Sequence, residues 1–295
     1  MAAMTEILTG RIIKGVGGNY NVATKSDGEF VCQARGLFRK KGISPIVGDI
    51  VEISVIDRDK ATGYLQEILP RKSELARPKV ANIDQVVLVC ATVAPPINLD
   101  VVDGFLIVCE NQGIDAILCI NKIDLDKDKL YLDIAKSFEM AKYQVICVSA
   151  AEDVGLDALR NVMTGKTSIL AGPSGVGKSS ILNALYPQYK LEVGGLSEKI
   201  QRGKHTTRHT SLLEVSEDTY VVDSPGFTSF SIGHIDKEHL QNYYREFRPY
   251  LEECYYIDCI HVSEHDCAVK ERVGIDIDTN RYERYVRYVT RRNDE

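Results

Sequence analysis

The order of two short motifs constrains this chain more than any other feature of its sequence. The run GPSGVGKS, Gly172–Ser179, fits the phosphate-loop pattern GxxxxGK[ST], and it stands between a strand-like run, TSIL, and a helical pattern, SSILNALYP. The tetrapeptide NKID, Asn121–Asp124, lies upstream of it. In Ras-like GTPases the phosphate loop comes first and the base-recognition tetrapeptide comes near the end of the domain. The reversed order predicts a circularly permuted nucleotide-binding fold.

Each part of the phosphate loop has a chemical task. Glycines let backbone N–H groups approach phosphate oxygens, Lys178 supplies a positive charge for the outer phosphates, and the Ser179 hydroxyl suits Mg²⁺. A glycine-rich turn without a ligand is the alternative, and the strand–turn–helix context argues against it. We expect the nucleotide to be bound by Gly172, Pro173, Ser174, Gly175, Val176, Gly177, Lys178, Ser179 and Ser180.

The tetrapeptide NKID is short, so its position carries the argument. The run AILCI before it has the pattern of a buried strand, which places Asn121, Lys122 and Asp124 at that strand's carboxyl end, where open α/β sheets bind ligands. The Asp124 carboxylate can accept from two donors that guanine has and adenine lacks, so we expect GTP rather than ATP. Ser149 and Ala150 follow a second buried run, QVICV, and are expected in a short turn beneath the base.

Two segments after the phosphate loop resemble the switches of GTPases. DSPG fits DxxG, in which Asp223 would reach Mg²⁺ through water and the Gly226 N–H would meet the γ-phosphate. Upstream, GKHTTRHT offers two hydroxyl groups as Mg²⁺ ligands, although an exposed polar loop is the alternative interpretation. Ser179 and Thr207 are the expected magnesium ligands, and Thr206 stays open as the alternative to Thr207.

The residue that activates water is not obvious from the switches. Phe227 follows DSPG, where many GTPases place the glutamine that orients the attacking water. A phenyl ring cannot do this, so either a partner accelerates hydrolysis or another group takes the role. His205 is the candidate catalytic residue, because an imidazole can orient or deprotonate water. His209 competes for this role, and a solvated histidine without a catalytic task stays open.

A cysteine and histidine cluster near the end of the chain predicts a metal site. Cys254, Cys259, His261 and Cys267 have the spacing C-x4-C-x-H-x5-C, and three thiolates with one imidazole suit a closed tetrahedral Zn²⁺ site. His265 is an alternative nitrogen ligand, and free or disulfide-bonded thiols are the alternative to metal. No position is left open for water, so this zinc should hold structure rather than catalyse.

The pattern of elements divides the 295 residues into three domains. Residues 1–71 contain five short alternating runs separated by turns, which predicts an OB-like β-barrel. OB folds commonly bind oligonucleotides, and we expect this domain to bind RNA. Strands alternate with helical stretches in residues 72–232, as the mainly parallel sheet of a GTPase domain requires. Residues 233–295 are mostly helical and contain the zinc pattern. The expected fold class is therefore a multidomain α/β protein.

Together these features resemble the ribosome small-subunit-dependent GTPase family, RsgA, also called YjeQ. The resemblance covers nearly the whole chain, through RGLFRKKGISPIVGD, the reordered NKID, SA and GPSGVGKS, then RGKHTT, DSPGF and the zinc pattern. It implies that the OB, permuted GTPase and zinc domains act together in late maturation of the small (30S) ribosomal subunit, which stimulates hydrolysis. The implied cofactors are GTP/GDP, Mg²⁺ and one structural Zn²⁺, and the implied partners are the small subunit and its rRNA.

Charge limits where rRNA can bind. The formal net charge is −6, so an rRNA contact needs local basic patches. Residues 1–71 carry ten Lys or Arg against eight Asp or Glu, with a cluster at Arg35, Arg39, Lys40 and Lys41. The last helix offers arginines for phosphates and tyrosines for base stacking, although packing of the tyrosines on their own domain is the alternative. These residues are Arg281, Arg284, Arg287, Arg291, Arg292, Tyr282, Tyr285 and Tyr288.

The remaining sequence features concern location and the competing functions. The other cysteines lie mostly in apolar runs, and the chain shows neither a signal peptide nor a long apolar stretch. We therefore expect a monomeric cytoplasmic protein without a membrane partner. Two other functions stay open, a nucleotide-gated RNA-binding scaffold with little hydrolysis and a GTPase with a non-ribosomal client. NKID argues against an ATPase.

Overall fold

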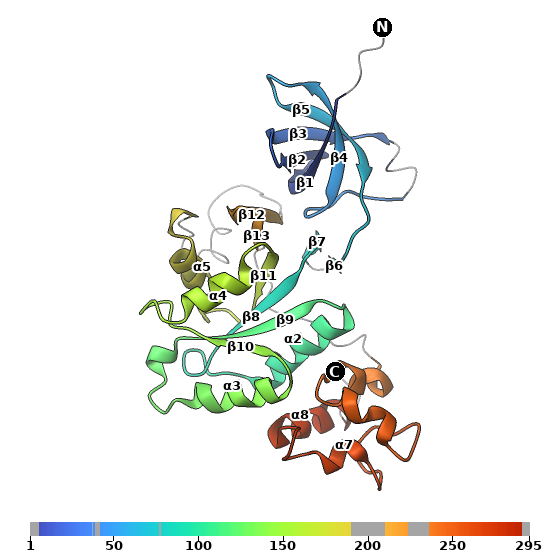
Figure 1. Ribbon diagram of the computed structural model, residues 1–295, viewed down its shortest axis with the longest axis vertical. Coiled ribbons are helices and arrows are strands. Elements are labelled where there is room, and N and C mark those ends of the chain that lie inside the picture. The colour runs from blue at the N-terminus through green and yellow to red at the C-terminus, as the bar shows by residue number, and fades with distance from the viewer. Residues whose placement is uncertain are drawn as a thin grey trace. The chain divides into compact units, whose positions relative to one another are not determined.

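A computed structural model describes residues 6–36, 38, 42–76, 78–189, 210–223 and 236–290 (Figure 1). Two compact units make up the chain. The first comprises Met1–Gln85, Val162–Leu170 and Gln188–Phe227, and the second comprises Val86–Asn161, Ala171–Pro187 and Thr228–Glu295. The three domain boundaries expected from the sequence remain predictions. The residues named above that lie outside the described ones are Arg39, Lys40, Lys41, His205, Thr206, Thr207, His209, Gly226, Phe227, Arg291 and Arg292.

A five-stranded barrel occupies the N-terminal part of the first unit. Its strands are β1 (Ile7–Val16), β2 (Asn19–Thr24), β3 (Gly28–Ala34), β4 (Ile50–Asp57) and β5 (Thr62–Ile68). Strand β1 pairs antiparallel with β2 and β4, β2 with β3, and β4 with β5, and a parallel pairing of β3 with β5 closes the ring. Alternate side chains point inward, so Ile12, Val22 and Leu65 are fully buried. The predicted OB-like barrel is confirmed.

Five further strands belong to the first unit. A small hairpin pairs β6 (Glu74–Ala76) with β7 (Lys79–Ala81), and a second pairs β12 (Ser211–Ser216) with β13 (Thr219–Asp223). Strand β13 also runs parallel to β11 (Thr167–Ala171), whose carboxyl end leads into the phosphate loop. The barrel joins these strands where Lys14 of β1 pairs with Ser211 of β12.

The second unit has the alternating pattern of strands and helices that the sequence predicts. Its strands are β8 (Gln85–Ala91), β9 (Asp115–Asn121) and β10 (Gln144–Cys147), and its helices here are α2 (Leu99–Asn111), α3 (Leu130–Met140), α4 (Leu156–Met163) and α5 (Lys178–Leu185), with short 3₁₀ turns η1 (Ile123–Leu125) and η2 (Pro187–Tyr189). Strands β9 and β10 are parallel, and every residue of β8 is buried. Helix α2 packs on β9 and α3 packs on β9 and β10, which explains the unbroken apolar runs of these strands.

Residues 236–290 form a small module, called the C-terminal module below, with little regular structure. Its elements are η3 (Lys237–Tyr243), η4 (Arg248–Glu253), α7 (Ala268–Glu271) and α8 (Thr279–Thr290). Its core is aromatic, because the ring of Phe247 lies 5.0 Å from that of Tyr244 and 4.9 Å from that of Tyr285. Ile107 of α2 belongs to the same buried cluster, so the core of the module continues into α2. No helix among the described residues is long and apolar enough to cross a membrane.

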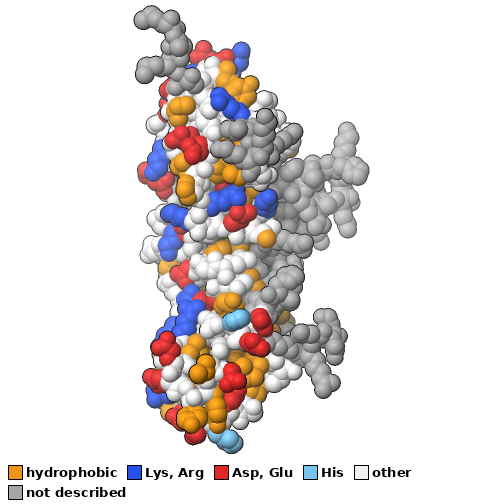
Figure 2. Space-filling model, turned by 90° about the vertical axis from the view of Figure 1, so that its right-hand side faces the viewer, with side chains coloured by type: hydrophobic (Ala, Val, Ile, Leu, Met, Phe, Trp, Pro, Cys, Tyr) orange, Lys and Arg blue, Asp and Glu red, His pale blue; other side chains and the backbone are white. Residues whose placement is uncertain are grey.

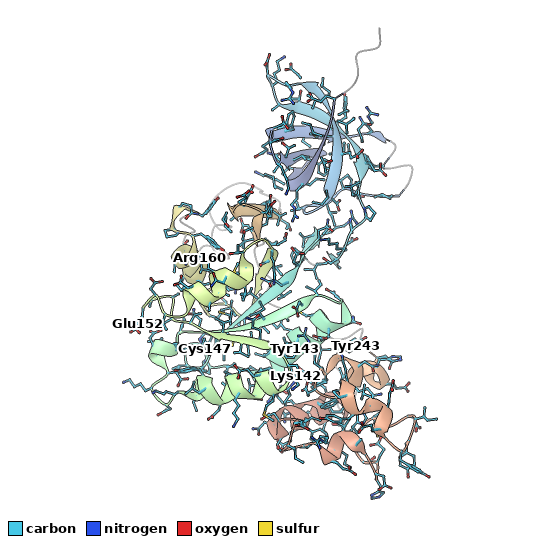
Figure 3. The ribbon with its side chains drawn as sticks, viewed as in Figure 1. Lys142, Tyr143, Cys147, Glu152, Arg160 and Tyr243 are labelled. Carbon is cyan, nitrogen blue, oxygen red and sulfur yellow. The ribbon has the colours of Figure 1, made fainter. Side chains whose placement is uncertain are left out.

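Charged groups also join the module to α2. Arg281 and Arg284 are almost completely buried, and both bind the buried carboxylate of Asp103, while Arg281 also binds Glu246. A further arginine, Arg245, lies over the ring of Tyr143 at 4.4 Å. Tyr143 is labelled in Figure 3. Two of the arginines expected to contact rRNA are therefore already neutralised inside the protein, and that expectation is wrong for them.

The tyrosines of α8 follow the alternative interpretation. Tyr285 is fully buried, and its hydroxyl donates to the carbonyl oxygen of Ile260 at 2.8 Å. The Tyr282 hydroxyl donates to the carbonyl oxygen of His261 at 2.8 Å, and that of Tyr288 donates to the carbonyl oxygen of Asp100. These rings pack within the protein rather than against nucleic acid bases.

Candidate functional site

The phosphate loop depends on glycine at both ends. Gly172 has φ +132° and Gly177 has φ +96°, values that residues with a side chain rarely adopt. A Cβ atom would lie 2.1 Å from the carbonyl oxygen of Val89 at the first position and 2.3 Å from Nδ2 of Asn121 at the second. The loop is therefore packed tightly against the strand end and against the NKID segment.

Lys178 and Ser179 lie at the start of α5, directly after the loop. Lys178 Nζ donates to the carbonyl oxygens of Gly172 and Pro173, at 2.7 and 2.8 Å. Burial lowers the pKa of Lys178, so its ammonium group gains from an anion nearby. Ser179 is buried in the first turn of α5, and the N-terminus of this helix favours negative charge. The loop thus presents an amine, a hydroxyl and helix N–H groups at one place.

Asn121 and Lys122 connect the NKID segment to this loop. Asn121 Nδ2 donates to the carbonyl oxygen of Val176 at 2.8 Å, and its Oδ1 accepts from the Ala150 N–H at 3.3 Å. Lys122 Nζ donates to the carbonyl oxygens of Gly175 at 2.7 Å and Ala94 at 2.5 Å. These two side chains fix the NKID segment against the phosphate loop, although the chain order of the two motifs is reversed.

Ala94 is a part of this arrangement that sequence reasoning missed. It contributes only its carbonyl oxygen, so its side chain gives no signal. The run APP after β8 is the one feature that marks the segment as a special turn.

The serine and alanine turn orients Asp124. Ser149 is fully buried, and its hydroxyl donates to Oδ1 of Asp124 at 2.6 Å. Paired backbone hydrogen bonds between Ser149 and Val154, at 3.0 and 3.1 Å, close the turn that follows Cys147 (Figure 3). This hydroxyl holds the carboxylate in one orientation. A fixed orientation suits a carboxylate that accepts hydrogen bonds from the edge of a base.

Of the two expected switches, the structure describes only Thr210 at the end of the first and Asp223 at the start of the second. Asp223 ends β13 in the first unit, and burial raises the pKa of its carboxyl group. A partly buried carboxylate gains from a nearby cation, which is consistent with the expected role beside Mg²⁺. His205, Thr206, Thr207 and Gly226 lie outside the described residues.

The four ligand atoms predicted for zinc converge. His261 Nδ1 lies 3.3 Å from the Sγ atoms of Cys259 and Cys267 and 3.6 Å from that of Cys254. The Sγ atoms of Cys254 and Cys267 are 4.0 Å apart. A tetrahedral Zn²⁺ with Zn–S bonds of about 2.3 Å and a Zn–N bond of about 2.05 Å separates its ligands by about 3.6 to 3.8 Å. The cluster therefore has the dimensions of a zinc site.

The protonation chemistry of the cluster also fits a metal. Burial lowers the pKa of His261, which favours the neutral imidazole that metals bind, and burial raises the pKa of Cys259 to about 12. Buried thiolates need a cation, and zinc supplies one. His265 is exposed and lies outside the cluster, so His261 is the nitrogen donor of this group.

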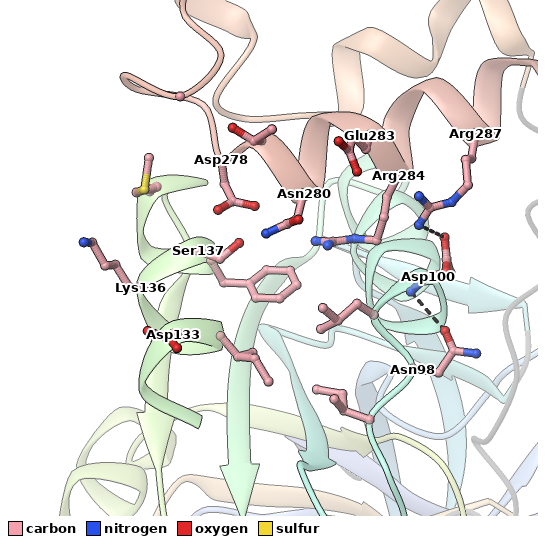
Figure 4. Close-up of a pocket in the computed structure, with 17 residues that line it drawn as sticks. Asn98, Asp100, Asp133, Lys136, Ser137, Asp278, Asn280, Glu283, Arg284 and Arg287 are labelled. Atoms are coloured by element: carbon pink, nitrogen blue, oxygen red, sulfur yellow. Dashed lines mark hydrogen bonds and ion pairs between the residues drawn. The ribbon is translucent and has the colours of Figure 1, made fainter. Parts of the chain in front are cut away.

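A wide cleft of about 810 Å³ lies between α2, α3 and α8 (Figure 4). Its two arginines are held by carboxylates: Arg287 pairs with Asp100 at 3.1 Å, and Arg284 binds Asp103. The side chain of Asn98 is occupied in capping α2. The cleft therefore offers a poorer site for chemistry than the phosphate loop.

Comparisons with known proteins agree with this geometry. The family model described as RsgA GTPase matches residues 68–233, and the model described as RsgA N-terminal domain matches residues 9–65. Two proteins named small ribosomal subunit biogenesis GTPase RsgA are similar over most of their length. The one from Alkaliphilus metalliredigens is 41% identical and covers 95% of this chain and 96% of its own, and the one from Ruminiclostridium cellulolyticum is 44% identical and covers 94% and 91%.

Solved structures lead to the same family. The crystal structure of YjeQ from Thermotoga maritima has a TM-score of 0.85 and 34% identity, covering 97% of this chain and all of its own. YloQ, described as a circularly permuted GTPase, has a TM-score of 0.81 and 31% identity, covering 98% and 96%. These likenesses confirm the permutation that the order of the motifs predicts. The chain therefore belongs to the RsgA GTPase family and is a GTP hydrolase with a circularly permuted fold.

Proposed function

We propose that this GTP hydrolase acts in late maturation of the small ribosomal subunit. The observation that carries the proposal is the match, over 94–95% of the chain, to relatives named as small ribosomal subunit biogenesis GTPases. The presence of the barrel and the C-terminal module beside the nucleotide-binding fold supports it, because both matched relatives span nearly this whole chain. The protein would then work in the cytoplasm, where small subunits mature.

The nucleotide is assigned to the phosphate loop and the NKID segment. Lys178 and the N-terminus of α5 hold the phosphates, Asp124 accepts from guanine, and the turn at Ser149 and Ala150 lies beneath the base. The hydrogen bond from Ser149 to Asp124 supports this assignment, because it leaves the carboxylate oriented before any ligand binds. Ser179 and Thr207 are the proposed direct Mg²⁺ ligands, with Asp223 acting through water and the Gly226 N–H meeting the γ-phosphate.

Zinc is assigned to Cys254, Cys259, His261 and Cys267. It would have four protein ligands and no position for substrate, so its contribution is to the fold. The rRNA contact is assigned to the barrel, because Arg281 and Arg284 of α8 are buried. Arg35 supports this, since it remains on the barrel surface over the ring of Tyr64 at 5.7 Å.

Steady-state GTP hydrolysis with purified small subunits tests the function. We expect small subunits to raise the turnover rate at least about tenfold, and large subunits to leave it unchanged, because a partner must complete a site that lacks the usual glutamine. Equal rates with either subunit, or with neither, would mean that the client is not the small subunit. The nucleotide assignment would survive that result.

The nucleotide-gated RNA-binding scaffold with little hydrolysis is a second candidate function, because Phe227 occupies the position of the usual glutamine.

If His205 is catalytic, His205→Ala should lower the subunit-stimulated turnover rate by about 100-fold, the loss typical of a missing general base or water-orienting group. GTP affinity should stay within about twofold.

His209→Ala is the matched control, since it removes an imidazole from the same segment. A loss confined to His209→Ala, an equal loss in both variants, or no loss in either would remove His205 from the catalytic role. A wild-type rate that stays near zero with small subunits bound would favour the scaffold.

A further inference from the structure

Three large side chains stand exposed in a row between two of the cysteine ligands. Tyr255 is 76% exposed, Tyr256 is 43% exposed and Ile257 is fully exposed. Single exposed apolar residues are ordinary on protein surfaces, whereas a contiguous group of them marks an interaction site. Residues 255–257 are called the Tyr–Tyr–Ile loop below.

The cluster of cysteines holds this loop in place. Cys254 directly precedes it and Cys259 follows it closely, and both sulfurs lie in the candidate zinc cluster. The Cys259 N–H donates to the carbonyl oxygen of Tyr256 at 3.3 Å, and the rings of Tyr255 and Tyr256 meet edge to face at 5.0 Å. A pinned loop loses little conformational entropy when it binds, and aromatic anchors of this kind dominate the energy of protein interfaces.

The charge around the loop distinguishes between possible partners. Residues 249–269 contain no lysine or arginine, and their exposed carboxylates are Glu252, Glu253, Asp258 and Asp266. Figure 2 shows hydrophobic side chains among Asp and Glu at the C-terminal module. A phosphate backbone would be repelled by such a surface, because nucleic acid binding depends on lysine and arginine contacts.

We propose that the Tyr–Tyr–Ile loop docks into an apolar depression on a basic protein of the small subunit. This inference rests on the proposed function, which supplies the class of partner. A protein that is itself bound to rRNA carries lysine and arginine to neutralise phosphates, so its surface complements the four carboxylates around the loop. Tyr255 and Ile257 fill the depression, and Glu252 and Glu253 form the charged rim. Unpaired rRNA bases stacking on the tyrosines are the competing occupant.

Charge reversal separates the two occupants. Glu252→Lys/Glu253→Lys should weaken binding to small subunits, in the presence of a non-hydrolysable GTP analogue, by about tenfold, because it opposes a basic protein. Tighter binding would overturn the proposal in favour of rRNA. Tyr255→Ser/Ile257→Ser should weaken binding by a similar factor, whereas Ile275→Ser, at an exposed position of the same module, should change it less than about twofold.

A photo-crosslinking amino acid at position 257 identifies the partner directly. We expect a crosslinked product that survives ribonuclease and is destroyed by protease, and a crosslink to rRNA would overturn the proposal. Basal GTP hydrolysis and zinc content should be unchanged in every variant, which shows that the module is intact. If wild-type protein does not bind small subunits, the proposed function fails; if it binds and the double variants bind equally well, only this inference fails.

Discussion

Asp124→Asn is expected to lower the affinity for GTP by a factor on the order of 10⁴, the discrimination shown by sites built to hydrogen-bond a substrate group. The carboxylate accepts from two guanine donors, and asparagine replaces one acceptor oxygen with an amide that faces the guanine amino group. Xanthine carries a carbonyl oxygen where guanine carries that amino group. The variant should therefore bind xanthosine triphosphate more tightly than GTP, which competition binding with labelled nucleotides measures.

Asp128→Asn is the control for this change. Asp128 is an exposed carboxylate a few residues along the same segment, so the substitution alters charge without reaching the base. It should leave the affinity for both nucleotides within about twofold. An Asp124→Asn protein that still prefers GTP would show that the guanine edge is read by another group.

Loss of the zinc is expected to unfold the C-terminal module. A structural zinc contributes on the order of 10 kcal/mol of binding free energy, and the short elements of the module depend on it in addition to their aromatic core. Helix α7 has four residues, and η3 and η4 are short 3₁₀ segments that do not persist alone. Cys267→Ser should abolish the one equivalent of zinc per chain and remove hydrogen-exchange protection from residues 236–290.

Cys147→Ser provides the comparison, because Cys147 is a partly buried cysteine outside the cluster. It should retain one zinc and the protection of the module, with a loss of about 1 kcal/mol or less in unfolding free energy. Full zinc content in Cys267→Ser, or unchanged protection after chelation, would contradict a structural metal at this cluster.

The sequence predicts local features of this protein well. The five alternating runs of residues 1–71 agree with strands β1 to β5 within a residue or two, because alternation and turn residues are encoded locally. These runs are EILTGRIIKG, NYNVAT, EFVCQAR, DIVEISVI and TGYLQEIL. The cysteine spacing likewise identifies four atoms that converge in space. Features of this kind can be predicted from a short stretch of sequence, because they do not depend on distant residues.

Long-range partners could not be obtained in the same way. Arg281 and Asp103 are 178 residues apart, and the arginines of α8 have the spacing of a solvated helix face. Their burial depends on a carboxylate supplied by a different helix, which the pattern of α8 cannot reveal. The sequence feature that could have indicated this burial lies in α2. There, Asp103 interrupts the otherwise apolar helical run VVDGFLIV.

Asp103 and Ile107 make α2 and the C-terminal module depend on each other, so the two should be inherited together. A chimera that transferred the module alone to another GTPase would carry a buried Arg284 without its carboxylate and a buried Arg281 with Glu246 as its one remaining ion-pair partner. Deleting it would leave Asp103 without its cations and Ile107 without cover. Viable recombinants within the family should therefore exchange α2 and the module together, as one heritable block, even though more than a hundred residues separate them in the gene.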